Sequence, residues 1–257
     1  MTSREKVEAL LKARSSRTSL TAFTDSEPGF SIEDGYAIQN AILNQAIQQG
    51  EKLSGFKMGL TSKAKQKDVS VFEPIRGFLL QSMEIVPNGV VELSTRIRPR
   101  AEPEIAIVLK EDLKGKNVMA RDIVARIYGI YLACEIIDSR YKDYKFKLPD
   151  VIADNTSASG YLLGNVNLLP YLEHLRLMGI TFRRNGEIVE TGAPAGALGD
   201  PIMSLVELVR SLSKTDEGLL AGQVVLTGGL TNSHFILPRD VFEVECAYDR
   251  FSFSVKE

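Results

Sequence analysis

The spacing of apolar residues predicts helices in the first fifty positions of the chain. Val7, Leu10 and Leu11 recur at helical spacing behind Thr2 and Ser3, which can cap a helix. Residues 23–30 contain Asp, Pro and Gly and are expected to form a loop. The N-terminal part is therefore predicted to be helical and interrupted by one loop.

A second helix is predicted from Ser31 onward. Asp34 stands three residues later and completes a variant of the capping box. Apolar residues then follow at intervals that place them on one helical face, namely Ile38, Ala41, Ile42 and Ala46. This face is expected to pack against the remainder of the protein.

After Gly55 the pattern changes to short strands separated by turns. Residues 84–91 are predicted to form a hairpin around Pro87-Asn88-Gly89. A strand is expected at 104–110, followed by a short helix at 118–126. Residues 128–137 are apolar almost throughout, which indicates a strand buried on both faces.

The C-terminal half continues this strand-rich pattern. Residues 181–189 are predicted to form a hairpin, because Asn185-Gly186 suits a type I′ turn. Asp200-Pro201 predicts a helix start, with a capping residue before a first-turn proline. Further strands are expected at 223–227, 241–247 and 251–255, with the last two paired. The sequence thus predicts a smaller N-terminal part, 1–75, and a β-rich core, 76–257.

Composition and charge exclude several classes of protein. Hydrophobic residues make up 44% of the chain and charged residues 25%, with a formal net charge of −2. Scattered Lys and Arg argue against nucleic-acid binding, which normally requires a concentrated basic face. Two cysteines do not suggest a disulfide framework. The start lacks a signal peptide and no segment is apolar enough to span a bilayer, so a cytoplasmic protein without membrane association is expected.

Three glutamates stand where burial is expected. Glu102 and Glu104 alternate along a strand and therefore share one face. Glu135 is the only charged residue in its apolar run. A buried carboxylate requires a cation, a proton or a metal, and oxygen ligands alone favour Mg²⁺ or Mn²⁺.

Ion pairing is the alternative interpretation of these glutamates. Glu102 and Glu104 could pair with Arg98 and Arg100, and Glu135 could pair with Arg140. The spacing of the residues alone leaves both interpretations open.

Five segments occur in an order that resembles the hydratase/decarboxylase branch of the fumarylacetoacetate hydrolase superfamily. The branch includes 2-oxopent-4-enoate hydratases and 4-oxalocrotonate decarboxylases of aromatic meta-cleavage pathways. The resemblance extends from about residue 30 to the C-terminus and is carried by Gly55–Ser62, Ala101–Ala106, Glu135–Arg140, Ala153–Ser157 and Thr227–Gly229. It implies an α+β fold, in which a mixed β-roll core carries a smaller helical N-terminal part.

The resemblance also implies roles for individual residues. The metal ligands correspond to Glu102, Glu104 and Glu135, and the active-site lysine corresponds to Lys57. Asp154 is a second candidate catalytic residue, which could hold Lys57 or orient a ligand or, alternatively, form an Asx turn with Asn155. Expected substrate-binding residues are Thr61, Ser62, Ile75, Arg76, Ser157, Thr227 and Gly228.

The segment Glu73-Pro74-Ile75-Arg76-Gly77 favours a decarboxylase over a hydratase. Hydratases of the branch usually have an acidic residue in a Pro-Asp-x-Gly segment, whereas decarboxylases usually have isoleucine there. Arg76 could receive the distal carboxylate of the substrate or lie in solvent. The expected reaction is the metal-dependent decarboxylation of 2-oxo-3-hexenedioate, a 2-oxo dicarboxylate.

Several alternatives and partners remain open from the sequence. A hydratase of the same branch is the first alternative, and an acylpyruvate hydrolase or a non-catalytic subunit are others. The resemblance also implies a homo-oligomer and association with a hydratase of the same pathway.

Overall fold

The computed structural model describes residues 1–62, 66 and 73–257 of the chain. Its helices are α1 (Ser3–Ser16), α2 (Phe23–Ser26), α3 (Ile32–Gln48), α5 (Ala120–Val124), α6 (Leu148–Ala153) and α7 (Pro201–Leu212). Its strands are β1 (Leu53–Gly59), β2 (Ile75–Leu80), β3 (Val90–Glu92), β4 (Arg100–Leu109), β5 (Ile127–Ile137), β6 (Ala158–Leu163), β7 (Ile180–Arg184), β8 (Glu187–Gly192), β9 (Val224–Leu226), β10 (His234–Phe235), β11 (Val241–Glu245) and β12 (Arg250–Lys256).

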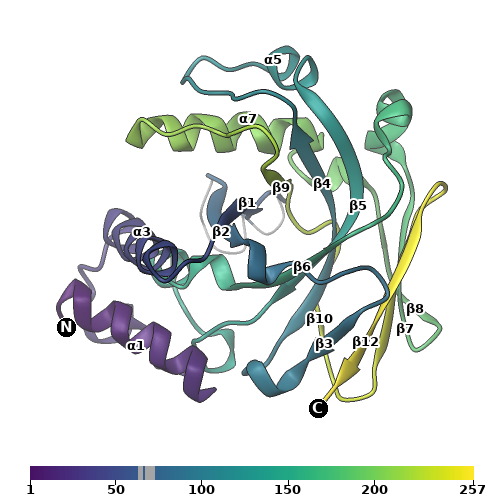
Figure 1. Ribbon diagram of the computed structural model, residues 1–257. Helices are drawn as coiled ribbons and strands as arrows, with labels where there is room; N and C mark the ends of the chain where they lie inside the picture. Colours follow the sequence, from purple (N-terminus) through teal and green to yellow (C-terminus); the bar gives the residue numbers. More distant parts are fainter. Residues whose placement is uncertain (63–65, 67–72) are drawn as a thin grey trace.

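A large mixed sheet forms the centre of the molecule (Figure 1). Its strand order is β2-β1-β9-β4-β5-β6, and β10 adds to β4. The long strands β4 and β5 pair antiparallel, whereas β9 lies parallel to β1 and antiparallel to β4. Most of β5 is buried, as its nearly continuous apolar sequence predicts. This sheet brings segments from both halves of the chain side by side.

A second sheet, β3-β12-β11-β7-β8, packs beside the first (Figure 1). Alternate residues of β12 are buried, as expected for a strand with one face against the core. The rings of Phe242 and Phe253 stack at 5.2 Å, and Phe182 stacks on Phe242 at 5.3 Å. These aromatic side chains contribute to the main hydrophobic core.

Helix α7 contributes the buried face that its sequence predicts. Asp200 caps it, since the carboxylate accepts a 2.9 Å hydrogen bond from the Ile202 amide. Pro201 occupies the first turn, where its missing amide hydrogen costs nothing. The buried residues Leu205, Leu208, Val209 and Leu212 then attach the helix to the core.

The N-terminal helices α1 and α3 lie at one side of the large sheet (Figure 1). The capping box predicted at Ser31 is present, and the cap predicted at Thr2 also forms a capping box, with Glu5. A separate apolar cluster joins them to the segment around Tyr141. The buried carboxylate of Asp150 on α6 also accepts hydrogen bonds from the amide and hydroxyl of Thr24 on α2. The N-terminal helical part therefore contacts α6 and helps to hold it in place.

Two hairpin predictions had different outcomes. The hairpin at 181–189 is confirmed, with Asn185 and Gly186 both at positive φ between β7 and β8. The hairpin at 84–91 is wrong, because β3 pairs in parallel with β12. Asn88 explains the difference, since its side chain bonds both the amide and the hydroxyl of Ser252. The Pro87-Asn88-Gly89 segment thus attaches β3 to the distant strand β12.

The α+β class and the helical N-terminal part are confirmed, and α2 forms a short turn within the predicted loop at 23–30. The division at residue 75 stays a prediction, and the large sheet extends across it from β1 to β4. Cys134 and Cys246 are both free. Within the residues that the structure describes, no helix combines the length and apolarity needed to cross a membrane.

Candidate metal centre and active site

The pairing of β4 with β5 brings the three predicted glutamates together. Glu102 lies directly opposite Glu135 in the antiparallel register, and Glu104 follows two residues along β4 on the same face. One carboxylate oxygen from each residue lies within 4.8 Å of the other two. The strand register thus creates a cluster of three carboxylates.

Two of the three glutamates, Glu104 and Glu135, have few hydrogen-bond donors among the described residues. Glu104 and Glu135 are fully buried, and Glu104 Oε1 and Glu135 Oε1 have no hydrogen-bond partner among the described residues. Burial, reinforced by the charge of Glu135, raises the pKa of Glu104 well above its usual range. Burial also raises the pKa of Glu135 to about 7, although the Lys57 ammonium opposes the rise. The carboxylates therefore favour binding of a cation.

Lys57 is the buried ammonium group beside this cluster. It lies on β1, with Nζ 2.9 Å from Glu135 Oε2 and 3.2 Å from the carbonyl oxygen of Thr156. Burial by itself would lower the pKa of Lys57, but the nearby carboxylates outweigh it and the net change is upward. Lys57 therefore carries a positive charge in the site.

The segment after β9 orients Glu104. The amide of Gly228 donates a 2.7 Å hydrogen bond to Glu104 Oε2. Gly228 has φ +110, and a Cβ atom there would stand 1.9 Å from Thr61 Oγ1. The side chain of Thr227 instead bonds the carbonyl of Ile105, 2.9 Å away. Thr227 therefore holds the loop against β4, and Gly228 orients Glu104. Neither residue lines the cavity beside the glutamate cluster.

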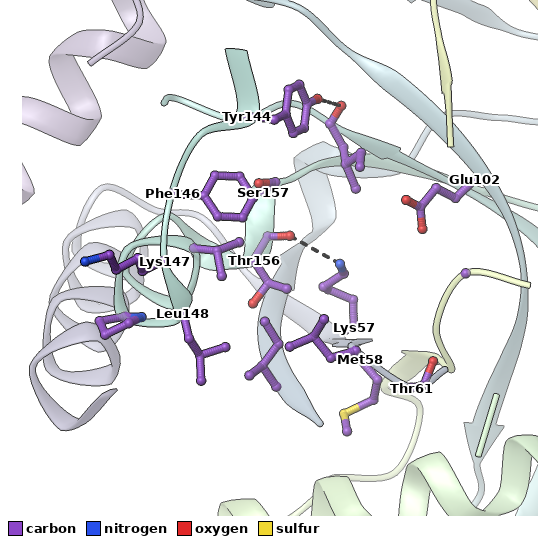
Figure 2. Close-up of a pocket in the computed structure, with 17 residues that line it drawn as sticks. Lys57, Met58, Thr61, Glu102, Tyr144, Phe146, Lys147, Leu148, Thr156 and Ser157 are labelled. Atoms are coloured by element: carbon purple, nitrogen blue, oxygen red, sulfur yellow. Dashed lines mark hydrogen bonds between the residues drawn. The ribbon is translucent and has the colours of Figure 1, made fainter. Parts of the chain in front are cut away.

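A strained turn faces Lys57 from the other side. Asn155, Thr156 and Ser157 have consecutive φ values of 51°, 52° and 59°. The left-handed conformation costs a residue with a side chain about 1–2 kcal/mol, so other contacts must hold it. The Asn155 side chain bonds the amide and carbonyl of Phe78, at 2.7 and 2.9 Å. The turn directs the Thr156 carbonyl at Lys57 (Figure 2).

The structure corrects the contact predicted between Asp154 and Lys57. The Asp154 carboxylate forms a buried ion pair with Arg140, whose backbone amide also donates to it at 3.0 Å. Burial raises the pKa of Asp154 to about 6, against the opposing effect of Arg140, so the carboxylate is ionised at neutral pH. Asp154 does not line the cavity, and it reaches Lys57 only through the backbone of the turn.

The three arginines proposed as ion-pair partners of the glutamates bind other groups. Arg140 pairs with Asp154 instead of Glu135. Arg98 pairs with Asp143, and Arg100 stacks on the rings of Tyr144 and Phe235, at 4.3 and 3.9 Å. The carboxylate cluster is therefore not explained by these arginines.

A cavity of about 560 Å³ opens next to the cluster. Lys57 and Glu102 lie at one end, and Phe146 and Leu148 stand across from them (Figure 2). The apolar lining residues are Met58, Leu60, Ile75, Ile137, Phe146, Leu148, Pro149 and Val151. The remaining lining residues are Lys57, Gly59, Thr61, Glu102, Tyr144, Lys147, Thr156, Ser157 and Gly229. The cavity is thus charged at one end and apolar along most of its wall.

The predicted substrate-binding residues fall into two groups. Thr61, Ile75 and Ser157 line the cavity, and Ser157 Oγ is buried without a hydrogen-bond partner among the described residues. Ser62 is half-buried next to Thr61 and outside the lining.

Arg76 does not line the cavity, and its contact with the substrate stays a prediction, whereas the alternative position in solvent is wrong because Arg76 is buried. Its guanidinium stacks on the ring of Tyr36, at 4.9 Å. Its Nε atom donates to Ser211 Oγ on α7, at 3.3 Å. Alternation along β2 explains the result, since adjacent residues point to opposite faces and Ile75 faces the cavity.

The donor set suits a hard divalent cation. It consists of carboxylate oxygens, with two buried oxygen atoms unpaired among the described residues. The pKa of Glu104 is raised first by burial and then by repulsion from Glu135. Oxygen ligation favours Mg²⁺, Mn²⁺ or Ca²⁺ over metals that prefer His or Cys. Glu102, Glu104 and Glu135 could therefore hold such an ion beside the cavity.

Sequence reasoning missed one functional contact and most of the cavity wall. Thr156 contributes its backbone carbonyl, so the identity of its side chain carries no signal. Phe146, Leu148 and Val151 form an apolar wall, and apolar residues in a sequence are ordinarily assigned to the core. Only the fold shows that these side chains face a cavity.

Comparisons with known proteins agree with this geometry. Residues 48–252 match the family model described as fumarylacetoacetate (FAA) hydrolase C-terminal. A 4-oxalocrotonate decarboxylase of Pseudomonas putida is 38% identical over 219 residues, 84% of this chain and 82% of the relative. A 2-keto-4-pentenoate hydratase of Paraburkholderia xenovorans is 34% identical over 239 residues, 93% of this chain and 89% of the relative.

A solved structure extends the similarity to the whole fold. The 4-oxalocrotonate decarboxylase from Pseudomonas putida G7, complexed with magnesium and adipate, superposes with a TM-score of 0.94. The two chains are 32% identical, and the match covers 99% of this chain and 98% of the other. The protein therefore belongs to the fumarylacetoacetate hydrolase family, in which its relatives are decarboxylases and hydratases.

Proposed function

We propose that the protein decarboxylates 2-oxo-3-hexenedioate (4-oxalocrotonate) to 2-hydroxypenta-2,4-dienoate and CO₂. The observation that carries this proposal is the polarity of the cavity, which has Glu102 and Lys57 at one end and the apolar residues Ile75, Phe146, Leu148 and Val151 in its wall. Such a cavity can bind the 2-oxo acid end of a substrate and leave its distal end in apolar surroundings.

Glu102, Glu104 and Glu135 would hold Mg²⁺ or Mn²⁺. When bound, such an ion supplies Lewis acidity toward the oxygens of a 2-oxo acid. The carboxylates would fix the position of the ion, and the backbone amide of Gly228 orients Glu104. Loss of any of these groups is expected to weaken substrate binding and turnover together.

Lys57 can stabilise the charge that the reaction moves. When the bond between C5 and C6 breaks, C6 leaves as CO₂ and its electron pair forms the C4–C5 double bond. The C3–C4 double bond shifts to C2–C3, and the negative charge reaches the C2 oxygen. A hydrogen bond from the Lys57 ammonium to that oxygen would strengthen as the charge grows, which lowers the barrier. The hydroxyl of Ser157 lines the same cavity and can donate to a second substrate oxygen.

The wall around Ile75 favours loss of CO₂ over addition of water. A carboxylate in apolar surroundings is poorly solvated, whereas CO₂ carries no charge and needs little solvation. Hydration would require an acid or base at the distal carbon, and Ile75 cannot serve as either. The side chains of Val151 and Leu148 near it are likewise apolar.

The relatives support the same assignment. The Pseudomonas putida decarboxylase is 38% identical, and the superposed structure contains magnesium and adipate. Adipate is a six-carbon dicarboxylate, as is the proposed substrate. We also propose that the protein assembles as a homo-oligomer and associates with a hydratase of the same pathway.

The test is an NMR assay of the purified protein with Mg²⁺. One sample receives 2-oxo-3-hexenedioate and another receives 2-hydroxypenta-2,4-dienoate. We expect CO₂ release from the first and no hydration of the second. Hydration of the second substrate without decarboxylation of the first would instead establish a hydratase. Lys57→Met serves as the inactive reference, and Lys214→Met, an exposed lysine paired with Glu73, serves as its matched control.

A further inference from the structure

A buried ion pair lies behind the cavity wall and does not touch the cavity. Arg140 is 6% exposed and Asp154 is 1% exposed. The guanidinium of Arg140 donates to the Asp154 carboxylate through Nε and to the Asp154 backbone carbonyl through a terminal nitrogen. Arg140 thus fixes both the side chain and the backbone of Asp154.

The same arginine hydrogen-bonds residues on both sides of the strained turn at Asn155–Ser157. Its other terminal nitrogen lies 2.7 Å from the carbonyl oxygen of Asp138 and 3.4 Å from that of Ala158, the residue that follows the turn. The amide of Asp138 in turn donates to the Ser157 carbonyl, at 2.8 Å. The Ser157 amide donates to the Asp154 carbonyl, at 3.0 Å. Arg140 therefore connects the residues before and after the turn.

The tip of the turn is fixed independently by β2. Asn155 bonds the backbone of Phe78, and Thr156 Oγ1 donates to the carbonyl of Arg76, at 3.0 Å. Gln39 on α3 donates to the same Arg76 carbonyl and to the carbonyl of Ile152. With its base held by Arg140 and its tip held by β2, the turn cannot relax from its left-handed conformation.

This matters because the turn presents a hydrogen-bond acceptor to Lys57. The Thr156 carbonyl lies 3.2 Å from Lys57 Nζ (Figure 2). The Glu135 carboxylate lies 2.9 Å from the same atom. A lysine ammonium sits on a flexible four-carbon stem, so its position depends on the groups that it bonds. Without the carbonyl, the attraction of the carboxylates alone would draw Lys57 toward the glutamate cluster.

We propose that Arg140 and Asp154 are positioning residues: they hold the Asn155–Ser157 turn so that the Thr156 carbonyl fixes the Lys57 ammonium at the cavity. The proposal rests on the proposed function in so far as Lys57 acts on the substrate. It assigns no chemical step to either residue of the pair.

The test compares Asp154→Asn with the wild-type protein. Asparagine preserves the shape of the side chain and removes the charge that holds Arg140. Arg140→Met is a second, stronger variant. The matched control is Asp240→Asn, because Asp240 is also buried, pairs with Arg184 at 2.7 Å and accepts a backbone amide, but lies at the second sheet. We measure kcat, KM, the Mg²⁺ dissociation constant by calorimetry and the crystal structure of each folded variant.

For Asp154→Asn, kcat should fall about 10- to 100-fold, because small displacements of a catalytic group have effects of this size. KM and the Mg²⁺ dissociation constant should stay within about twofold of wild type. In the crystal, Lys57 Nζ should leave hydrogen-bonding distance of the Thr156 carbonyl. Asp240→Asn should lower the melting temperature and leave kcat unchanged.

The proposal is overturned if Asp154→Asn leaves kcat and the position of Lys57 unchanged, or if Asp240→Asn lowers kcat equally. Failure of the proposed function looks different, because wild-type protein would then release no CO₂ from 2-oxo-3-hexenedioate. If the protein is a hydratase, the kinetic comparison is made with its own substrate. If it turns over neither substrate, the crystal structure of Asp154→Asn decides the position of Lys57 on its own.

Discussion

Glu104→Gln should make the protein more stable when no metal is present. Glu104 is fully buried, and glutamine keeps its size and its acceptor for the Gly228 amide. The new amide group can also donate to Glu135, which removes a repulsion and supplies a hydrogen bond. The variant nevertheless loses a ligand of the proposed metal site. Stability and metal binding are therefore expected to change in opposite directions.

The magnitude follows from the separation of the carboxylates. Two charges within 4.8 Å of each other repel by at least about 3 kcal/mol at an effective dielectric constant of about 20. Lys57 offsets part of this repulsion, and protonation relieves another part. We therefore expect a gain of about 1–2 kcal/mol in EDTA, or about 2–8 °C in melting temperature for a chain of this size.

The dependence of this gain on pH has a definite sign. Burial raises the pKa of Glu104 above its unfolded value, so an ionised Glu104 costs stability at neutral pH. Because the cost disappears as the pH falls through the folded-state pKa toward the unfolded one, the advantage of the glutamine variant should shrink in the same direction. In EDTA the difference in melting temperature should thus be larger at pH 8 than at pH 5.

Thermal unfolding followed by circular dichroism, with EDTA or with Mg²⁺, measures both effects. Wild-type protein should gain about 2.7 kcal/mol at a Mg²⁺ concentration one hundred times its dissociation constant. Glu104→Gln should gain almost nothing. The control is Glu243→Gln, which removes an outer-sheet carboxylate paired with Arg183 and should leave the Mg²⁺ effect intact. If Glu104→Gln is less stable than wild type in EDTA and still responds fully to Mg²⁺, the cluster is a structural ion-pair network and the reasoning is refuted.

Three further substitutions test other parts of the site. Ile75→Asp places a carboxylate in the apolar cavity wall and should lower kcat/KM for decarboxylation at least about tenfold by NMR assay, because the like charge weakens binding of the distal carboxylate of the substrate, whereas Ile75→Leu should retain most of the activity. Gly228→Ala places a Cβ atom 1.9 Å from Thr61 Oγ1 and should weaken Mg²⁺ binding about tenfold by calorimetry; unchanged affinity would contradict the role of the loop. Asn155→Ala removes both bonds to Phe78 and should cost about 2–3 kcal/mol in urea unfolding, and a loss below about 0.5 kcal/mol would show that the turn is held elsewhere.

The carboxylate cluster could be predicted from sequence because two simple rules meet there. Strand alternation places Glu102 and Glu104 on one face, and the apolar context of Glu135 implies burial. What the sequence could not supply is the register of β4 against β5, which sets Glu102 opposite Glu135. Register depends on the whole sheet, so convergence of the three residues was a hypothesis until the fold was known.

The partner of each buried charge was harder to predict than the charge itself. Arg140 is five residues from Glu135 and fourteen from Asp154, yet it pairs with the more distant carboxylate. The strand that contains Glu135 ends at Ile137, and the chain then turns back toward Asp154. Arg76 shows the same limit, since alternation along β2 alone turns it away from its neighbour Ile75. Short-range patterns identify such residues but do not determine which way they point.

The position of β9 between β1 and β4 has a consequence for biosynthesis. β9 comes from residues 224–226, whereas β1, which carries Lys57, ends at residue 59. The lysine and the glutamates of β4 are thus joined in one sheet only after most of the chain has been synthesised. Pairing between such distant segments is slow, because a large loop must close first. A ribosome-bound chain that ends before residue 224 would therefore lack the strand that joins Lys57 to the glutamates, and metal acquisition is expected to be among the last steps of folding.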